Sequence, residues 1–327
     1  MTALRDRVVA TVRKLRRPDA TPPAIGEQPG VSSRQLGEGA WLLQTRTGPR
    51  RLRAQRVGTA SWLLEPRRRP QRAVRRLGRA NLRSHLLVDE QAVAEDPRGF
   101  QLGLATHASR HHVAWMLREL GVSCVLDVGA NVGQYARSLR AAGYTGRIVS
   151  FEPLAHLVED LEKASANDPD WQVLPYALGD EDAEAEINAV PGTMSSMLTS
   201  SDFGKQWSSV LRDMHPETIR IRRLDGLLDQ ALAGLESPRV YLKLDTQGYD
   251  LQAFAGAGER ITEVVGMQSE VACVPIYDGM PRLSEQIEVY EAAGFELTGM
   301  FPVTIDRTSL RVIEFDAVMI RVDALPA

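Results

Sequence analysis

The chain has 327 residues, of which 43% are hydrophobic and 25% charged, and its formal net charge is −3. This size allows a large buried core and indicates one large domain, alone or with an appendage. Two cysteines, Cys124 and Cys273, are too few for a disulfide framework, and no CxxC motif indicates a zinc site. No apolar run reaches the roughly 18 residues of a membrane helix, so we expect no membrane span and a cytoplasmic location.

The charges are distributed unevenly along the chain. Residues 1–90 contain 20 Lys or Arg and 7 Asp or Glu, whereas the remainder contains 19 basic and 35 acidic residues. Charge segregation of this size predicts an appendage that meets a partner, an anionic surface or the acidic body itself. We therefore expect a flexible basic arm at 1–30, a small β-containing, Arg-rich module at 31–100 and the main domain at 101–327.

The predicted N-terminal module has two notable patterns. The sequence GEGAWLL at 37–43 is similar to GTASWLL at 58–64, which indicates either two similar strands or a coincidence. Eight arginines between 66 and 83 could bind phosphates or form a solvated helix or linker. The module could form a homodimer, recruit a partner or bind an anionic surface, and the residues do not choose among these.

From about residue 105 onward, helical and strand patterns alternate. Short apolar runs predict buried strands at 124–128, 148–152, 171–174, 240–244 and 264–271. Helical spacing appears between them and at 283–293, whereas 190–220 reads as a long irregular insert. The last two predicted strands, 295–301 and 313–321, have no helix between them and so form a hairpin. We predict an α/β, Rossmann-like fold with a mixed seven-stranded sheet and helices on both faces.

A glycine-rich loop follows the first strand of this domain. Its residues Gly129 to Gly133 allow a sharp turn, and the helix starting near Gln134 offers free N–H groups to a carboxylate. Glu152 ends the next strand, where a carboxylate can accept hydrogen bonds from ribose hydroxyls. The third strand is followed by Ala177 and Asp180, where an adenine could lie. Together these features predict an adenosine-containing ligand, and the absence of G-x-G-x-x-G spacing argues against NAD(P).

Three segments resemble the motif series of the FkbM-type methyltransferases over about residues 110–321. They are VLDVGANVG at 125–133, FEP at 151–153 and LKLDTQGYD at 242–250. The resemblance implies a class I fold that binds S-adenosylmethionine and methylates a hydroxyl of a small molecule, sugar or glycolipid. It implies that the methionine end is held by Asp127 and by the loop residues Gly129, Asn131 and Gly133. This chain departs from the family in one place, because the neutral Gln247 stands where an acid is common.

Methyl transfer to an alcohol requires a group that removes the hydroxyl proton. Asp245, at the end of its strand, and Glu270, near the end of the next, are the candidates for a base. Two such carboxylates with open coordination positions would also suit Mg²⁺. The structural alternative is that Asp245 caps a helix and Glu270 belongs to a structural pair. Ser195, Ser196, Met197 and Trp207 in the long insert, and Tyr277, could cover the acceptor.

Two other functions remain open from the residues alone. The basic N-terminal arm could serve a nucleic-acid methyltransferase, although the chain has no Asn/Asp-Pro-Pro-Tyr/Phe motif and no Pro-Cys nucleophile. We therefore do not expect a nucleic-acid partner. The other alternative is a non-catalytic protein that keeps the cofactor loop as a scaffold.

Overall fold

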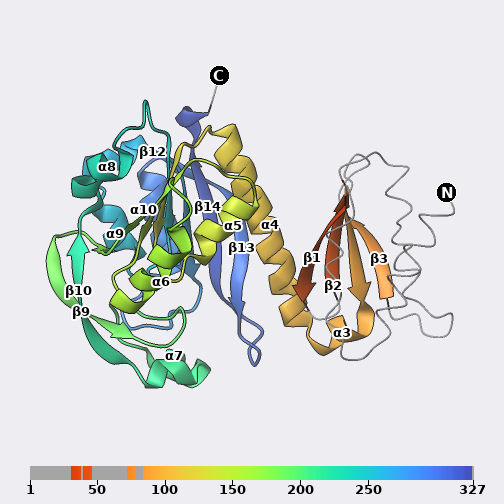
Figure 1. Cartoon of the computed structure of the whole chain (residues 1–327). Helices are drawn as coiled ribbons and strands as arrows, with labels where there is room; N and C mark the ends of the chain where they lie inside the picture. Colours follow the sequence, from red (N-terminus) through yellow and green to blue (C-terminus); the bar gives the residue numbers. More distant parts are fainter. Residues whose placement is uncertain (1–30, 38–39, 46–71, 78–83, 326–327) are drawn as a thin grey trace. The chain divides into compact units, whose positions relative to one another are not determined.

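The computed structural model describes residues 31–37, 40–45, 72–77 and 84–325 (Figure 1). The chain divides into two compact units, Met1–Leu104 and Ala105–Ala327. In the first unit the described strands form an antiparallel sheet in the order β1-β2-β4-β3. They are β1 (Val31–Gly37), β2 (Ala40–Thr45), β3 (Arg72–Leu77) and β4 (Ser84–Asp89), and α3 (Glu90–Glu95) follows. The arm at 1–30, the second repeat at 58–64 and much of the arginine run lie outside the described residues.

A seven-stranded sheet forms the centre of the second unit, in the order β13-β14-β12-β11-β5-β6-β7. Its parallel strands are β5 (Cys124–Val128), β6 (Arg147–Phe151), β7 (Trp171–Leu174), β11 (Val240–Leu244) and β12 (Val264–Ala272). The hairpin of β13 (Phe295–Ile305) and β14 (Val312–Arg321) adds two antiparallel strands. This sheet confirms the predicted mixed α/β fold.

Helices cover both faces of this sheet (Figure 1). Apolar side chains of α4 (Pro97–Glu119), α5 (Gln134–Ala141) and α6 (Ala155–Ser165) form one buried cluster with the sheet. The second cluster contains apolar side chains of α8 (Leu224–Leu232), α9 (Asp250–Ala255) and α10 (Leu283–Ala292). The central strands β5, β11 and β12 are buried along their whole length, as continuous apolar strands between two helical layers should be.

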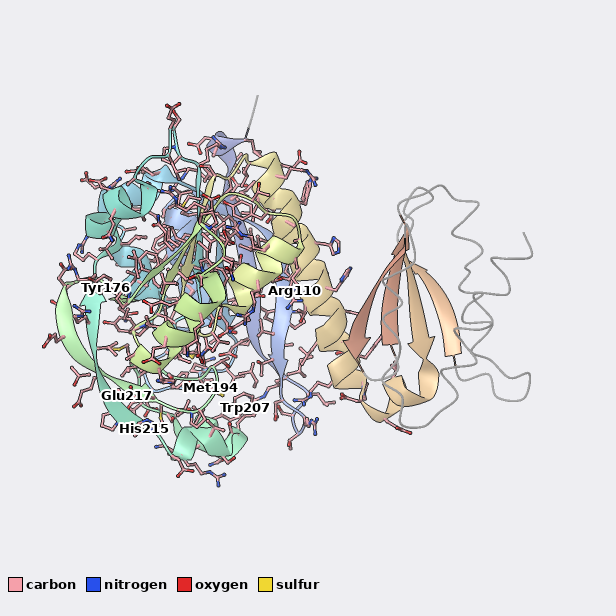
Figure 2. All side chains as sticks on the ribbon, in the orientation of Figure 1. Arg110, Tyr176, Met194, Trp207, His215 and Glu217 are labelled. Carbon is pink, nitrogen blue, oxygen red and sulfur yellow. The ribbon has the colours of Figure 1, made fainter. Side chains whose placement is uncertain are left out.

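A second, three-stranded sheet lies beside the main one, in the order β8-β10-β9. It consists of β8 (Ala177–Leu178), β9 (Ala183–Ala189) and β10 (His215–Arg222). The expectation of an irregular segment at 190–220 is partly wrong, because β10 begins there and α7 (Asp202–Trp207) and the 3-10 turn η2 (Ser209–Arg212) precede it. Figure 2 shows Met194, Trp207 and the start of β10 at one end of the unit.

Two further 3-10 turns complete the second unit, η3 (Gly258–Glu263) before β12 and η4 (Val322–Ala324) after β14. Across the part of the chain that the structure describes, no helix combines the length and the apolarity needed to span a bilayer.

Candidate active site

A cavity lies at the carboxyl ends of the parallel strands. About 660 Å³ of space, partly open to solvent, lies among the loops that follow β5, β6, β7 and β11. Strand β5 pairs with both β6 and β11, so the strand order reverses there, which is where open α/β sheets bind ligands. The predicted site residues that line the cavity are Gly129, Asn131, Gln134, Glu152, Ala177 and Asp245.

The loop after β5 is shaped by left-handed backbone conformations. Gly129, Asn131 and Gly133 have φ values of 72°, 49° and 78°. A Cβ at Gly129 would lie 1.9 Å from the carbonyl oxygen of Asp245. The loops after β5 and β11 therefore touch backbone to backbone, and this contact requires glycine. Gly133 does not line the cavity and instead makes the turn into α5.

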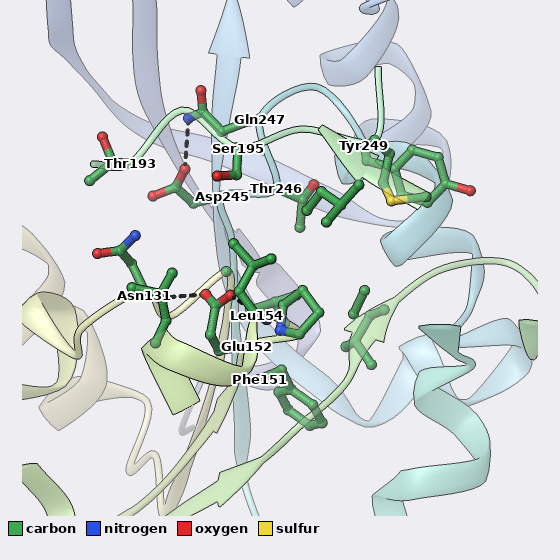
Figure 3. Close-up of a pocket in the computed structure, with 18 of the residues that line it drawn as sticks. Asn131, Phe151, Glu152, Leu154, Thr193, Ser195, Asp245, Thr246, Gln247 and Tyr249 are labelled. Carbon is green, nitrogen blue, oxygen red and sulfur yellow. Dashed lines mark hydrogen bonds between the residues drawn. The ribbon is translucent and has the colours of Figure 1, made fainter. Parts of the chain in front are cut away.

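Glu152 holds the end of β6 against this loop. Its Oε2 accepts a hydrogen bond from the N–H of Asn131 at 2.9 Å, and its Oε1 accepts one from the N–H of Leu154 at 3.1 Å (Figure 3). The side chain is buried, and burial raises the pKa of Glu152 to about 7. Each carboxylate oxygen keeps a further lone-pair direction with which it can accept a hydroxyl of a ligand in the cavity.

Asp127 lies beneath the loop rather than at the cavity wall. It is fully buried, and its Oδ1 lies 3.1 Å from Nζ of Lys243 on the neighbouring strand β11. The same ammonium donates to the carbonyl of Gly129 at 3.1 Å and lies 3.3 Å from Oδ2 of Asp245. Burial lowers the pKa of Lys243, but the carboxylates of Asp127 and Asp245 reverse the effect and raise it overall. Lys243 therefore stays charged and joins the two loops.

Asp245 directly follows β11, and its carboxylate reaches the cavity (Figure 3). Its side chain is 35% exposed, and its Oδ1 accepts a hydrogen bond from Nε2 of Gln247 at 3.2 Å. The same nitrogen donates to Oε2 of Glu270 at 2.8 Å. Glu270 is buried and does not line the cavity. Burial, with the nearby carboxylates of Glu314 and Asp245, raises the pKa of Glu270 well above its usual range.

The pair Asp245 and Glu270 does not fit the expected Mg²⁺ site. The amide nitrogen of Gln247 donates to both carboxyl groups, and a donating amide nitrogen has no lone pair for a metal. Magnesium also favours ionised carboxylates, whereas burial favours the protonated form of Glu270. Within the described ranges, no three His, Cys, Asp or Glu side chains are grouped as metal ligands would be.

Only part of the segment predicted to bind the adenine, Ala177 to Asp180, reaches the cavity. Ala177 lines the cavity, but Asp180 does not, and its carbonyl accepts a hydrogen bond from Arg223 at 2.5 Å. Two tyrosines form the wall here instead, Tyr176 before β8 and Tyr249 after β11. Guanidinium groups of two arginines of β10 lie 5.2 and 5.7 Å from the Tyr176 ring.

The insert expected to cover the acceptor reaches the cavity with one short segment. Thr193, Ser195 and Met197 line the wall, and the buried Ser196 hydroxyl donates to the carbonyl of Gln247 at 2.7 Å. Trp207 does not line the cavity and packs in a separate apolar cluster. The segment 193–197 is thereby held against the loop after β11.

Sequence reasoning missed several residues at the site. They are Tyr176, Thr193, Lys243, Thr246 and Tyr249. A signal existed for Lys243, because a charged residue inside the apolar run VYLKL must find a buried partner. A signal also existed for Thr246 and Tyr249, which stand in the LKLDTQGYD segment.

The strand order, the antiparallel strand β14 and the cavity at the reversal of the order are those of the class I S-adenosylmethionine-dependent methyltransferases. The family model described as the methyltransferase FkbM domain matches residues 127–297, which is more than half of the chain. The chain belongs to the FkbM methyltransferase family and is an S-adenosylmethionine-dependent enzyme.

Two solved structures with bound S-adenosylmethionine are similar to this chain at low sequence identity. Magnesium protoporphyrin IX methyltransferase from Synechocystis PCC 6803 is 11% identical, with a TM-score of 0.37, over 68% of this chain and 83% of that one. Fibrillarin from Aeropyrum pernix is also 11% identical, with a TM-score of 0.38, over 89% and 97%. These scores are too low to carry an argument about substrate. No curated protein matches the sequence.

Proposed function

We propose that this enzyme transfers a methyl group from S-adenosylmethionine to a hydroxyl of a small molecule, a sugar or a glycolipid. The observation that carries this proposal is the Asp245 carboxylate, which faces the cavity between two fixed donors. Lys243 lies 3.3 Å from one oxygen, and Gln247 donates to the other at 3.2 Å. A carboxylate held in this way is oriented to accept a proton from a hydroxyl in the cavity.

The residues around the other half of the cavity fit S-adenosylmethionine. The N-terminus of α5 at Gln134 has no side-chain cap, so its N–H groups suit the methionine carboxylate. Glu152 would accept the ribose hydroxyls, and Ala177, Tyr176 and Tyr249 would surround the adenine. The cofactor supplies an electrophilic methyl group on a sulfonium sulfur when it is bound.

Asp245 would act while the acceptor oxygen approaches the methyl carbon. Bound S-adenosylmethionine would supply its methyl group to that oxygen, and the electron pair of the carbon–sulfur bond would stay on sulfur. The hydroxyl proton passes to Asp245, which neutralises the carboxylate and leaves a methyl ether. Positioning contributes as well, because the reaction needs the oxygen about 3–3.5 Å from the carbon and in line with the breaking bond.

The charges of the cavity favour a neutral acceptor over a phosphate-bearing one. Of the described residues that line the cavity, none is Lys, Arg or His, and Glu152 and Asp245 are acidic. Thr193 and Ser195 add hydroxyl groups on the wall that faces Asp245 (Figure 3). Carboxylates and hydroxyls recognise alcohols by hydrogen bonds but repel phosphates, which argues against a nucleic-acid acceptor at this site.

The test is to identify the methylated product directly. The purified enzyme is incubated with S-adenosylmethionine carrying a deuterated methyl group and with metabolite and glycolipid extracts of a strain that lacks the gene. We expect a labelled methoxy group by mass spectrometry and NMR. Label on nitrogen, carbon or nucleic acid would contradict the proposal.

The variant Asp245→Asn separates catalysis from binding in the same assay. Loss of the base should slow transfer by about 10²–10⁴-fold and leave the affinity for S-adenosylmethionine unchanged. Asp278→Asn is the matched control, because Asp278 is exposed and does not line the cavity. Equal rates for the two variants would remove Asp245 from the mechanism.

A further inference from the structure

The side chain of Gln247 uses all of its hydrogen-bonding groups inside the protein. Its nitrogen donates to Asp245 at 3.2 Å and to Glu270 at 2.8 Å. Its Oε1 lies 3.2 Å from the hydroxyl of Tyr277, whose single proton is shared with the carbonyl of Met194 at 2.7 Å. The reversed amide would direct Oε1 at the Asp245 carboxylate, which can only accept, so the network favours the orientation with the nitrogen facing Asp245.

The backbone of Gln247 is also held in this place. Its φ is 54°, in the left-handed region, and its carbonyl accepts the hydrogen bond from the Ser196 hydroxyl. The residue is buried. A non-glycine residue in this conformation persists only where surrounding contacts stabilise it. The Gln247 amide therefore has a fixed position in the site between Asp245 and Glu270.

We propose that Gln247 is a positioning residue that occupies the place of a divalent cation between Asp245 and Glu270, so that methyl transfer by this enzyme needs no bound metal. The proposal rests on the proposed function, in which Asp245 receives the acceptor proton. The amide orients the Asp245 carboxylate as a cation would, but it withdraws less charge. Asp245 therefore remains a better proton acceptor than a metal-bound carboxylate would be.

Replacing Gln247 by Glu tests whether this position can hold a cation, because the two side chains have almost the same shape. Gln247→Glu exchanges the two N–H donors for a carboxylate oxygen, so the new carboxylate joins those of Asp245 and Glu270 in a group of three. Three carboxyl groups in one place repel one another, and a divalent cation relieves the repulsion. The variant should therefore gain a cation site that the natural chain lacks.

The experiment measures binding of Mn²⁺ to the full-length enzyme by electron paramagnetic resonance and calorimetry. We expect Gln247→Glu to bind Mn²⁺ at least about tenfold more tightly than the natural chain, because a third carboxylate joins the site. Adding Asp245→Asn to that variant should abolish the gain. Gln230→Glu, which adds the same charge on the exposed side of α8, is the matched control and should gain nothing.

Two results would overturn the proposal. One is that folded Gln247→Glu, checked by its binding of S-adenosylmethionine, binds Mn²⁺ no better than Gln230→Glu. The other is that the natural chain binds Mn²⁺ tightly and Asp245→Asn abolishes that binding, and this arm is readable even if Gln247→Glu does not fold. Neither readout needs the acceptor, so an error in the proposed hydroxyl chemistry would appear in the labelling experiment alone.

Discussion

The two sides of the cavity are built in different ways. On the side of β5 and β6, the loop at 129–133 and Glu152 are held by backbone N–H groups, such as those of Asn131 and Leu154. On the side of β11 and β12, side chains hold one another, with Gln247 bonded to Asp245 and Glu270. The first side therefore depends on the backbone geometry of its loops. The second side depends on hydrogen bonds and charge balance between side chains.

This difference predicts how each side fails. A change in backbone geometry should destroy the first side together with the fold around it. A change of side chain on the second side should leave the fold intact when charge is conserved, and should damage it when a buried charge loses its partner. The following variants test that distinction.

Gly129→Ala should have the largest effect, because it acts on both sides at once. The positive φ costs about 1–3 kcal/mol for a non-glycine residue, and the clash with the Asp245 carbonyl raises the total above about 4 kcal/mol. Gly143→Ala is the control, since Gly143 also has a positive φ but no atom within 4 Å of an added Cβ. Urea unfolding measures the loss in the free energy of unfolding for both variants. Equal losses would show that the contact between the two loops contributes nothing.

Lys243→Met should come next, because it leaves Asp127 buried without a counter-charge. We expect a loss of about 3–5 kcal/mol in the free energy of unfolding. Adding Asp127→Asn should restore more than half of it, which a purely steric role for Lys243 would not allow. Lys163→Met, which breaks an exposed pair with Asp160, should leave the melting temperature unchanged.

The sequence was sufficient to predict the main sheet, because its strands are apolar runs buried on both faces and its helices have clear spacing. It failed for β9 and β10. Burial alternates along both strands, with Glu184 and Arg220 exposed and Ile187, Ile219 and Ile221 buried. This period of two is a strand signal, but it is weakened because alanine and charged residues have a low strand propensity and Pro216 lies at the start of β10.

The sequence predicted the site residues that directly follow a strand. It did not predict the contacts that depend on the register between neighbouring strands. Glu152 and Asp245 follow their strands and line the cavity as placed. Asp127 lies inside β5, one residue before the end of the strand, and it is paired in register with Lys243 of β11. Residues in register share a face of the sheet, so these two charges meet beneath the loop. Glu270 is likewise directed at Gln247, which the order of residues alone does not show.

Glu152→Ala should weaken cofactor binding with a smaller effect on the fold. The carboxyl group would accept two ribose hydroxyls, and each hydrogen bond contributes about 0.5–1.5 kcal/mol, so we expect a roughly 10–100-fold weaker affinity for S-adenosylmethionine. Calorimetry measures it, with the exposed Glu159→Ala of α6 as control. An unchanged affinity would remove Glu152 from the ribose site and weaken the distinction between the two sides.

The smallest effect is a dependence of stability on pH that originates in the buried carboxyl groups behind Asp245. Burial is the main cause that raises the pKa of Asp316 to about 6, of Asp250 to about 7 and of Glu314 to about 8. Because the unfolded chain releases these protons near about pH 4, the folded enzyme binds more protons between about pH 4 and 8, and its stability falls as the pH rises through that window.

Other carboxylates act in the opposite direction. The hydrogen bond from Arg140 lowers the pKa of Asp168, so its contribution to stability is lost as the pH falls below about 4. The melting temperature should therefore be highest near about pH 4 and decline toward about pH 8. Glu314→Gln removes one of the buried titrations and should flatten the decline between about pH 6 and 8. If the slope of this variant equals that of the natural chain, then Glu314 is ionised in the folded enzyme and the side chains behind Asp245 carry more negative charge than their burial allows.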